Sequence, residues 1–244
     1  MMKNLKNSSN HFSNYNMKKL AIFDFDGTLF DSIDDVVVCF NKVLTIYGFP
    51  TLTRDEYIPC LGGNIDDIVS KVLGDNNTPQ NLEKVKKTYL DLYNTSKKEL
   101  TIPFNNSYES LKILQDNNVL LAINSNRLND SLNEFVDKFF PDIDFILIEG
   151  HDTVNPSKPD PFGVNKIIDK AKVDLDETVY IGDSITDIKT AQNAGIDCVV
   201  VKWGYGDENV YNQEYPLKVI SDFSEQFQWN EAKQKPYYGA VQKR

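Results

Sequence analysis

The sequence has 244 residues, of which 41% are hydrophobic and 25% charged, a composition typical of a globular protein with one large core or a core and a smaller second domain. The 26 basic and 36 acidic residues give a net charge of −10, so a nucleic-acid-binding or anionic-membrane-binding surface is not expected. No apolar run approaches the roughly 20 residues of a membrane span, and the three cysteines form no CxxC pair. We expect a cytoplasmic protein with buried thiols.

Both ends of the chain lack the patterns of folded elements. Residues 1–17 are rich in Asn and Ser and contain no apolar block, which argues against a secretory signal. Residues 228–244 are polar with little periodicity. We expect a disordered N-terminal extension and a short C-terminal tail.

Short apolar runs alternate with helical patterns along most of the chain. The runs typical of buried parallel strands are Lys19–Asp24, Val119–Asn124, Phe145–Ile148, Thr178–Ile181 and Cys198–Lys202. Stripes of apolar residues predict helices over Ser131–Phe140, Phe162–Ala171 and Asp183–Ala194. This alternation predicts an α/β fold with a doubly wound, Rossmann-like parallel sheet, in which ligands bind beyond the carboxyl ends of the strands.

The stretch from residue 32 to residue 100 interrupts this alternation. Its apolar residues keep helical spacing, with helices expected to end at Gly48 and Gly74 and a capping box expected at Thr53 and Glu56. We predict an all-helical cap domain over residues 32–100, inserted into an α/β core made of residues 18–31 and 101–227.

Two acids follow the first strand in the segment Asp24-Phe25-Asp26-Gly27-Thr28. Carboxylates two residues apart in an extended chain face the same side and repel each other unless a cation lies nearby. One of them is a candidate nucleophile and the other a candidate general acid/base, working with a hard divalent metal ion. The alternative is an acidic turn between a strand and a loop.

A second acidic pair, Asp183 and Asp187, comes at the end of a later predicted strand. Mg²⁺ prefers oxygen ligands and usually takes only one or two protein carboxylates. Asp183 is therefore a candidate ligand, with Asp187 behind it. The alternative is that Asp183 is only a helix N-cap and Asp187 an acid in the first helical turn.

Two phosphate-binding candidates lie between the acidic pairs. The Ser125 hydroxyl follows the run Val119–Asn124, and Lys158 sits in a loop stiffened by Pro159 and Pro161. The alternatives are a helix N-cap for the serine and a solvated surface side chain for the lysine. In a parallel sheet, all of these positions converge on one edge.

In this order and spacing, the motifs resemble those of the haloacid dehalogenase-like hydrolase superfamily, and within it the phosphoglycolate phosphatase-like group. The resemblance covers about residues 19 to 227. It rests on the Asp24–Thr28 segment, Ser125, Lys158-Pro159, the segment from Gly182 to Asp187, and two further segments, Ala191–Gly195 and Trp203-Gly204-Tyr205-Gly206. It implies a Mg²⁺-dependent phosphatase acting on a small phosphorylated metabolite.

The resemblance also implies roles for single residues. Asp24 attacks phosphorus, and Asp26 protonates the leaving alcohol and then activates water. The metal ion lies between Asp24, the main-chain carbonyl of Asp26, Asp183 and the phosphate.

Around these residues, Ser125, Asn126 and Lys158 hold phosphoryl oxygens, while Asp187 and Thr28 support the site from behind. Asn126 and Arg127 are both within reach of a substrate in this arrangement, and a solvated Arg127 is the alternative.

The predicted cap offers three positions that would select the leaving group, namely Arg54, Gly62 and Gly63. For the glycines, a plain turn between helices is the alternative.

Asp26 argues against dehalogenation, because displacing a halide needs no proton donor. A phosphosugar mutase, a pyrophosphatase and a non-catalytic phosphate-binding regulator stay open as alternatives. Either a monomer or a homodimer is compatible with the sequence.

Overall fold

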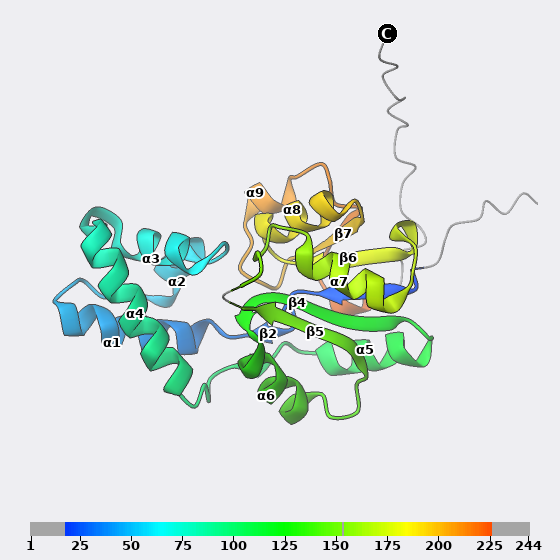
Figure 1. The fold of residues 1–244 in the computed structure, drawn as a ribbon, viewed down its shortest axis with the longest axis horizontal. Coiled ribbons are helices and arrows are strands. Elements are labelled where there is room, and N and C mark those ends of the chain that lie inside the picture. Colours follow the sequence, from blue (N-terminus) through cyan, green and yellow to red (C-terminus); the bar gives the residue numbers. More distant parts are fainter. Residues whose placement is uncertain (1–17, 153, 226–244) are drawn as a thin grey trace, which may run out of the picture.

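The computed structural model describes residues 18–152 and 154–225, so the predicted extension and tail lie outside the described residues. Its centre is a six-stranded sheet of order β5-β4-β1-β6-β7-β8, in which every neighbouring pair is parallel (Figure 1). The strands are β1 (Leu20–Phe23), β4 (Leu120–Leu128), β5 (Phe145–His151), β6 (Thr178–Gly182), β7 (Asp197–Val201) and β8 (Lys218–Ile220). The predicted parallel sheet is confirmed, and β8 adds an edge strand that is too short to show a pattern in the sequence.

Helices cover both faces of the sheet, as a doubly wound fold requires. Side chains alternate along β1, so Ala21 and Phe23 join one hydrophobic cluster with α5 (Ser107–Asp116) and α6 (Asn129–Phe139). Leu20 and Ile22 join another on the opposite face. That second cluster includes α7 (Phe162–Ala171) and α8 (Ile185–Ala194).

Four helices form a separate group on one side of the sheet (Figure 1), which we call the helical block. They are α1 (Ile33–Tyr47), α2 (Arg54–Tyr57), α3 (Ile65–Leu73) and α4 (Pro79–Thr95). The block has its own apolar cluster, in which the rings of Phe40 and Tyr89 stack with their centroids 3.7 Å apart. This separate cluster supports our division of the chain into a core and a helical cap over residues 32–100, which we keep as an interpretation of the fold.

The sequence correctly predicted where three of these helices begin or end. Gly48 follows α1 with a φ of 71°, a left-handed conformation that glycine adopts without strain. Thr53 and Glu56 form the predicted capping box at the start of α2. Gly74 follows α3, again as predicted.

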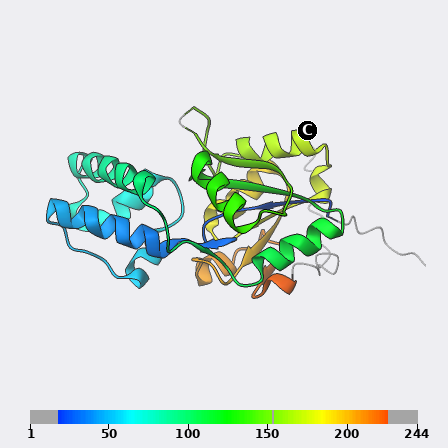
Figure 2. The same cartoon turned by 90° about the horizontal axis from the view of Figure 1, so that it is seen from below.

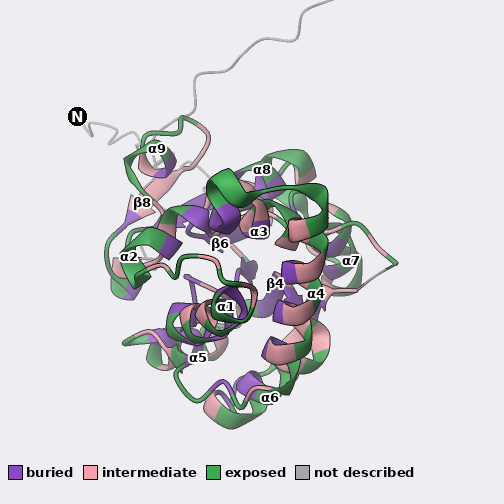
Figure 3. Ribbon diagram, turned by 90° about the vertical axis from the view of Figure 1, so that its left-hand side faces the viewer, coloured by how far each residue is buried: buried purple, intermediate pink, exposed green. Residues whose placement is uncertain are grey.

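The chain passes between sheet and block at a two-stranded antiparallel ribbon of β2 (Phe30–Asp31) and β3 (Ile102–Pro103). In Figure 2 the two connections run next to each other between the two parts. Seen from the side of the block, α1, α3 and α4 lie in front of β4 and β6 (Figure 3). The block therefore stands over the sheet edge where the predicted site residues gather. None of the described helices is long and apolar enough to cross a membrane.

Candidate active site

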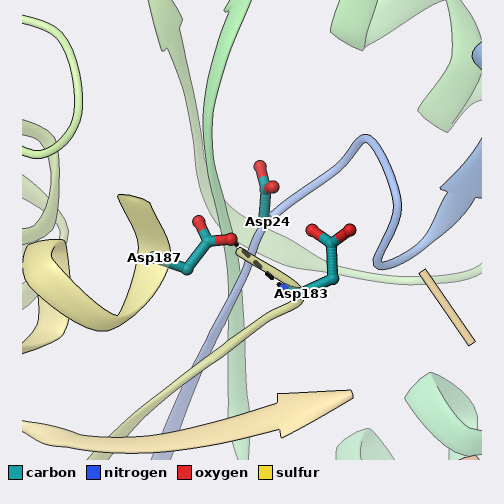
Figure 4. A group of neighbouring side chains, drawn as sticks. All are labelled: Asp24, Asp183 and Asp187. Atoms are coloured by element: carbon teal, nitrogen blue, oxygen red, sulfur yellow. Dashed lines mark hydrogen bonds between the residues drawn. The ribbon is translucent and has the colours of Figure 1, made fainter. Parts of the chain in front are cut away.

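Three buried carboxylates meet where β1 and β6 end. Asp24 follows β1, Asp183 follows β6, and Asp187 lies in the first turn of α8. One oxygen of each lies within 4.8 Å of the others (Figure 4). β1 and β6 are adjacent and in register, and the Asp24 amide donates to the Ile181 carbonyl at 2.9 Å. The predicted convergence of the two acidic pairs on one sheet edge is thus present in the structure.

Lys158 is the cation of this cluster. Its ammonium lies 2.7 Å from Asp24 Oδ1 and 2.8 Å from Asp187 Oδ1, and the side chain is buried. The alternative of a solvated surface lysine is wrong. The loop that carries it is held by Asn126, whose Oδ1 accepts from the Lys158 amide at 2.9 Å and whose Nδ2 donates to the Lys158 carbonyl at 3.2 Å.

The Asp187 carboxylate accepts hydrogen bonds from its own helical turn and also pairs with Lys158. Its Oδ2 accepts from the amides of Asp183 (3.2 Å) and Ser184 (3.0 Å) and from the Ser184 hydroxyl (2.6 Å). Ser184, and not Asp183, is the N-cap of α8, so the alternative reading of Asp183 as a plain N-cap is wrong. Both oxygens of Asp187 therefore have partners, whereas, among the described residues, the Asp183 carboxylate accepts a hydrogen bond at Oδ2 alone, from the Tyr205 amide.

The cluster carries more negative charge than Lys158 balances. Burial and the charge of Asp187 raise the pKa of Asp24 from 3.8 to about 7. Burial, followed by the charges of Asp187 and Asp24, also raises the pKa of Asp183. Mg²⁺ prefers hard oxygen donors such as carboxylates. These carboxylates are buried close together, and without a metal ion their mutual repulsion opposes ionisation. The residues therefore fit a Mg²⁺ ion. Asp24 and Asp183 are the side chains with oxygens to offer it.

Asp26 has different partners from Asp24. The Ser32 hydroxyl donates to its Oδ1, and Arg127 binds it through Nε, at 3.1 Å from Oδ2, and through Nη2. Burial opposes ionisation of Asp26, but the charge and hydrogen bonds of Arg127 outweigh it and lower the pKa of this carboxyl. Because 32% of the side chain is exposed, Asp26 remains accessible to a ligand.

The fixed position of Arg127 was not predicted from the sequence. The alternative of a solvated side chain is wrong, because Arg127 is buried. Its guanidinium lies 5.1 Å from the Phe25 ring centroid and 5.4 Å from that of Tyr93 in the helical block. The available signal was its place two residues after Ser125 in one strand, since such residues share a face.

Of the three predicted phosphate-binding side chains, Ser125 and Asn126 lie on β4, next to β1, and Lys158 lies in the loop after β5. Ser125 is a strand residue that accepts from the Arg127 amide at 3.2 Å, so the N-cap alternative for it is wrong. Ser125, Asn126 and Lys158 line one common pocket, but Asp24 and Asp183 are not among the residues that line it. Thr28, predicted to support the site, is buried, and its carbonyl accepts from the Trp203 indole at 2.9 Å.

Of the three positions predicted in the cap, Arg54 and Gly63 contact residues of the core. Gly62 and Gly63 have φ values of 86° and 94°, and the Gly63 carbonyl accepts from Asn126 Nδ2 at 3.2 Å. Arg54 pairs with Asp31 of the core at 3.1 Å and with Asp34 of α1 at 3.2 Å. A role for any of the three in choosing substrate stays a prediction.

Comparisons with known proteins agree with this geometry. The family model of haloacid dehalogenase-like hydrolases matches residues 21–201. A phosphoglycolate phosphatase of Pseudomonas syringae pv. tomato is 30% identical over 210 residues, covering 84% of this chain and 77% of the relative. One from Aquifex aeolicus is 28% identical over 204 residues, covering 84% and 94%.

The fold is also known from a solved structure. A Bacteroides fragilis protein assigned to the haloacid dehalogenase-like hydrolases superposes with a TM-score of 0.78 at 29% identity, covering 86% of this chain and 99% of its own. The prediction made from the motifs is therefore confirmed: this chain belongs to the haloacid dehalogenase-like hydrolase family.

Proposed function

We propose that the protein is a Mg²⁺-dependent phosphatase that hydrolyses a small phosphomonoester resembling phosphoglycolate through an aspartyl-phosphate on Asp24. The observation that carries the proposal is the position of Asp24, buried at a strand end with the Lys158 ammonium at 2.7 Å and Asp183 beside it. The names of the relatives support the substrate class.

In the first step, an Asp24 oxygen forms a bond to phosphorus while the bond from phosphorus to the alcohol oxygen breaks. Asp24 must be ionised to attack, and its raised pKa shows that Lys158 alone does not secure this. Bound Mg²⁺, held by Asp24, Asp183 and the main-chain carbonyl of Asp26, would supply the missing positive charge for the carboxylates and the phosphate.

Asp26 handles the protons in both steps. It gives a proton to the departing alcohol oxygen, and it later takes one from the water whose oxygen displaces Asp24 from phosphorus. Paired with Arg127 and Ser32, Asp26 is ionised, which is the form required for the second step. In the first step it carries a proton, which weakens its pairing with Arg127.

Ser125, Asn126 and Lys158 hold the oxygens of the transferring group in this proposal. The Asn126 side chain fixes the main chain of Lys158, and the Lys158 ammonium lies 2.7 Å from Asp24 Oδ1. Preorganised donors of this kind stabilise charge as it develops in the transition state.

The test is phosphate release by the purified full chain with Mg²⁺, from phosphoglycolate, p-nitrophenyl phosphate and a panel of sugar phosphates and nucleotides. Asp24→Asn should abolish turnover, and EDTA should abolish wild-type turnover until Mg²⁺ is added back. Asp137→Asn, an exposed change on α6, serves as the matched control. Undiminished turnover in Asp24→Asn would sink the proposal, whereas isomerised sugar phosphate in place of free phosphate would identify a mutase.

A further inference from the structure

The segment after β7, Trp203 to Gly206, lies between the acid site and the start of the helical block. The Tyr205 amide donates to Asp183 Oδ2 at 2.6 Å. A Cβ on Gly204 would collide with the Gly27 carbonyl and with the Asp183 side chain. The main chain of this segment is therefore fitted closely against the strand ends that carry the buried acids.

The side chain of Tyr205 reaches in the opposite direction, to the first residues of α1. Its phenol oxygen accepts from the amides of Ser32 (2.7 Å) and Ile33 (3.1 Å), and its hydroxyl donates to Asp31 Oδ1 (3.0 Å). The first amides of a helix have no partner within the helix, and a side chain at the N-cap usually satisfies one of them. The N-cap residue of α1, Ser32, makes no such bond. The phenol oxygen of Tyr205 takes its place.

This arrangement leaves the Ser32 hydroxyl for another partner, and it donates to Asp26 Oδ1. Ser32 is buried, and the hydrogen bond from its amide to the Tyr205 phenol oxygen holds its main chain in place. A continuous set of hydrogen bonds thus runs from Asp183 through Tyr205 and Ser32 to Asp26.

We infer that Tyr205 is a positioning residue for the proposed reaction: its phenol holds the start of α1 against the core so that Ser32 orients Asp26. The inference rests on the proposed function. Tyr205 itself touches neither phosphorus nor the leaving group in this scheme. It sets the geometry of Asp26, which acts on the attacking water.

Tyr205→Phe tests the inference because it removes the phenol oxygen and leaves the ring and the amide bond to Asp183. Tyr57→Phe is the matched control, since it removes a buried phenol that donates to Asn41 Oδ1 at 2.8 Å inside the helical block. p-Nitrophenyl phosphate is the substrate, because p-nitrophenolate leaves without needing a proton. Its release in a single turnover therefore depends little on Asp26, whereas hydrolysis of the intermediate needs Asp26 as base.

For Tyr205→Phe we expect steady-state turnover to fall about tenfold, because Ser32 then holds Asp26 less firmly in its catalytic position. The single-turnover release of nitrophenolate should change less than about twofold on the same reasoning. Tyr57→Phe should leave both rates unchanged. Equal losses in both rates would overturn the inference, because a general weakening of the fold slows both steps alike. No loss in either rate would also overturn it.

Amide hydrogen exchange followed by NMR gives a second readout that needs no activity. In the metal-free protein, Tyr205→Phe should speed exchange at the Ser32 and Ile33 amides about tenfold, and Tyr57→Phe should not. Unchanged exchange at both amides would overturn the inference even if turnover falls. If wild type releases no nitrophenolate at all, the proposed function fails, and exchange alone decides whether Tyr205 holds the start of α1.

Discussion

Replacing Asp24 by Asn should make the metal-free protein more stable while removing its activity. The pKa of Asp24 is raised from 3.8 to about 7, chiefly by burial and then by the charge of Asp187. Each pH unit of such a difference corresponds to about 1.4 kcal/mol, so keeping this carboxylate ionised at pH 8 costs the folded state about 4 kcal/mol. Asn carries no charge and avoids this cost.

The sign of the pH dependence follows from the protons bound. Between pH 4 and pH 7 the folded state keeps the Asp24 proton and the unfolded state does not, so the stability of wild type falls as pH rises. We expect Asp24→Asn to exceed wild type by about 2 to 4 kcal/mol at pH 8, because Asn packs less favourably against Lys158 than the carboxylate does. At pH 5 the difference should be less than about 2 kcal/mol.

Urea unfolding in EDTA at both pH values measures these differences. Asp137→Asn should stay within about 0.5 kcal/mol of wild type at either pH, as exposed substitutions usually do. Added Mg²⁺ should then stabilise wild type by about 2.7 kcal/mol at a hundred times its dissociation constant, and the Asp24→Asn variant by much less. A variant that is no more stable than wild type at pH 8 in EDTA, or that differs equally at both pH values, would refute the reasoning.

Three further changes probe the other parts of the site. Lys158→Met should reduce turnover at least about 100-fold at saturating substrate, because it removes the cation that contacts Asp24; a smaller loss would contradict that role. Arg127→Met should raise the pKa of Asp26, because it removes the cation that pairs with this carboxyl. The acidic limb of the pH profile of kcat, which reports Asp26 as base, should then move to higher pH. An unmoved limb would show that Arg127 does not control this carboxyl. Gly204→Ala should lower the unfolding free energy by about 2 kcal/mol or more in thermal melts, because its Cβ would collide with Asp183; an unchanged melting temperature would refute the close fit.

The sequence alone determined the longer strands, most of the helices and the sheet edge at which the candidate site lies. Helical spacing and end signals such as Gly48 depend on neighbours a few residues away, so they can be read directly from the chain. The positions of Asp24 and Asp183 could be inferred because parallel strands end at a common edge, wherever each strand lies in the sheet.

Only the tertiary structure decided which side chains pair with each other. Arg127 and Asp26 are 101 residues apart, and their contact depends on the register between β4 and β1 and on the rings packed around the guanidinium. Tyr205 and Ser32 are 173 residues apart, and they meet because the helical block lies against the loop after β7. Periodicity records which face of an element is buried, whereas such contacts arise from the packing of whole elements, which no local pattern encodes.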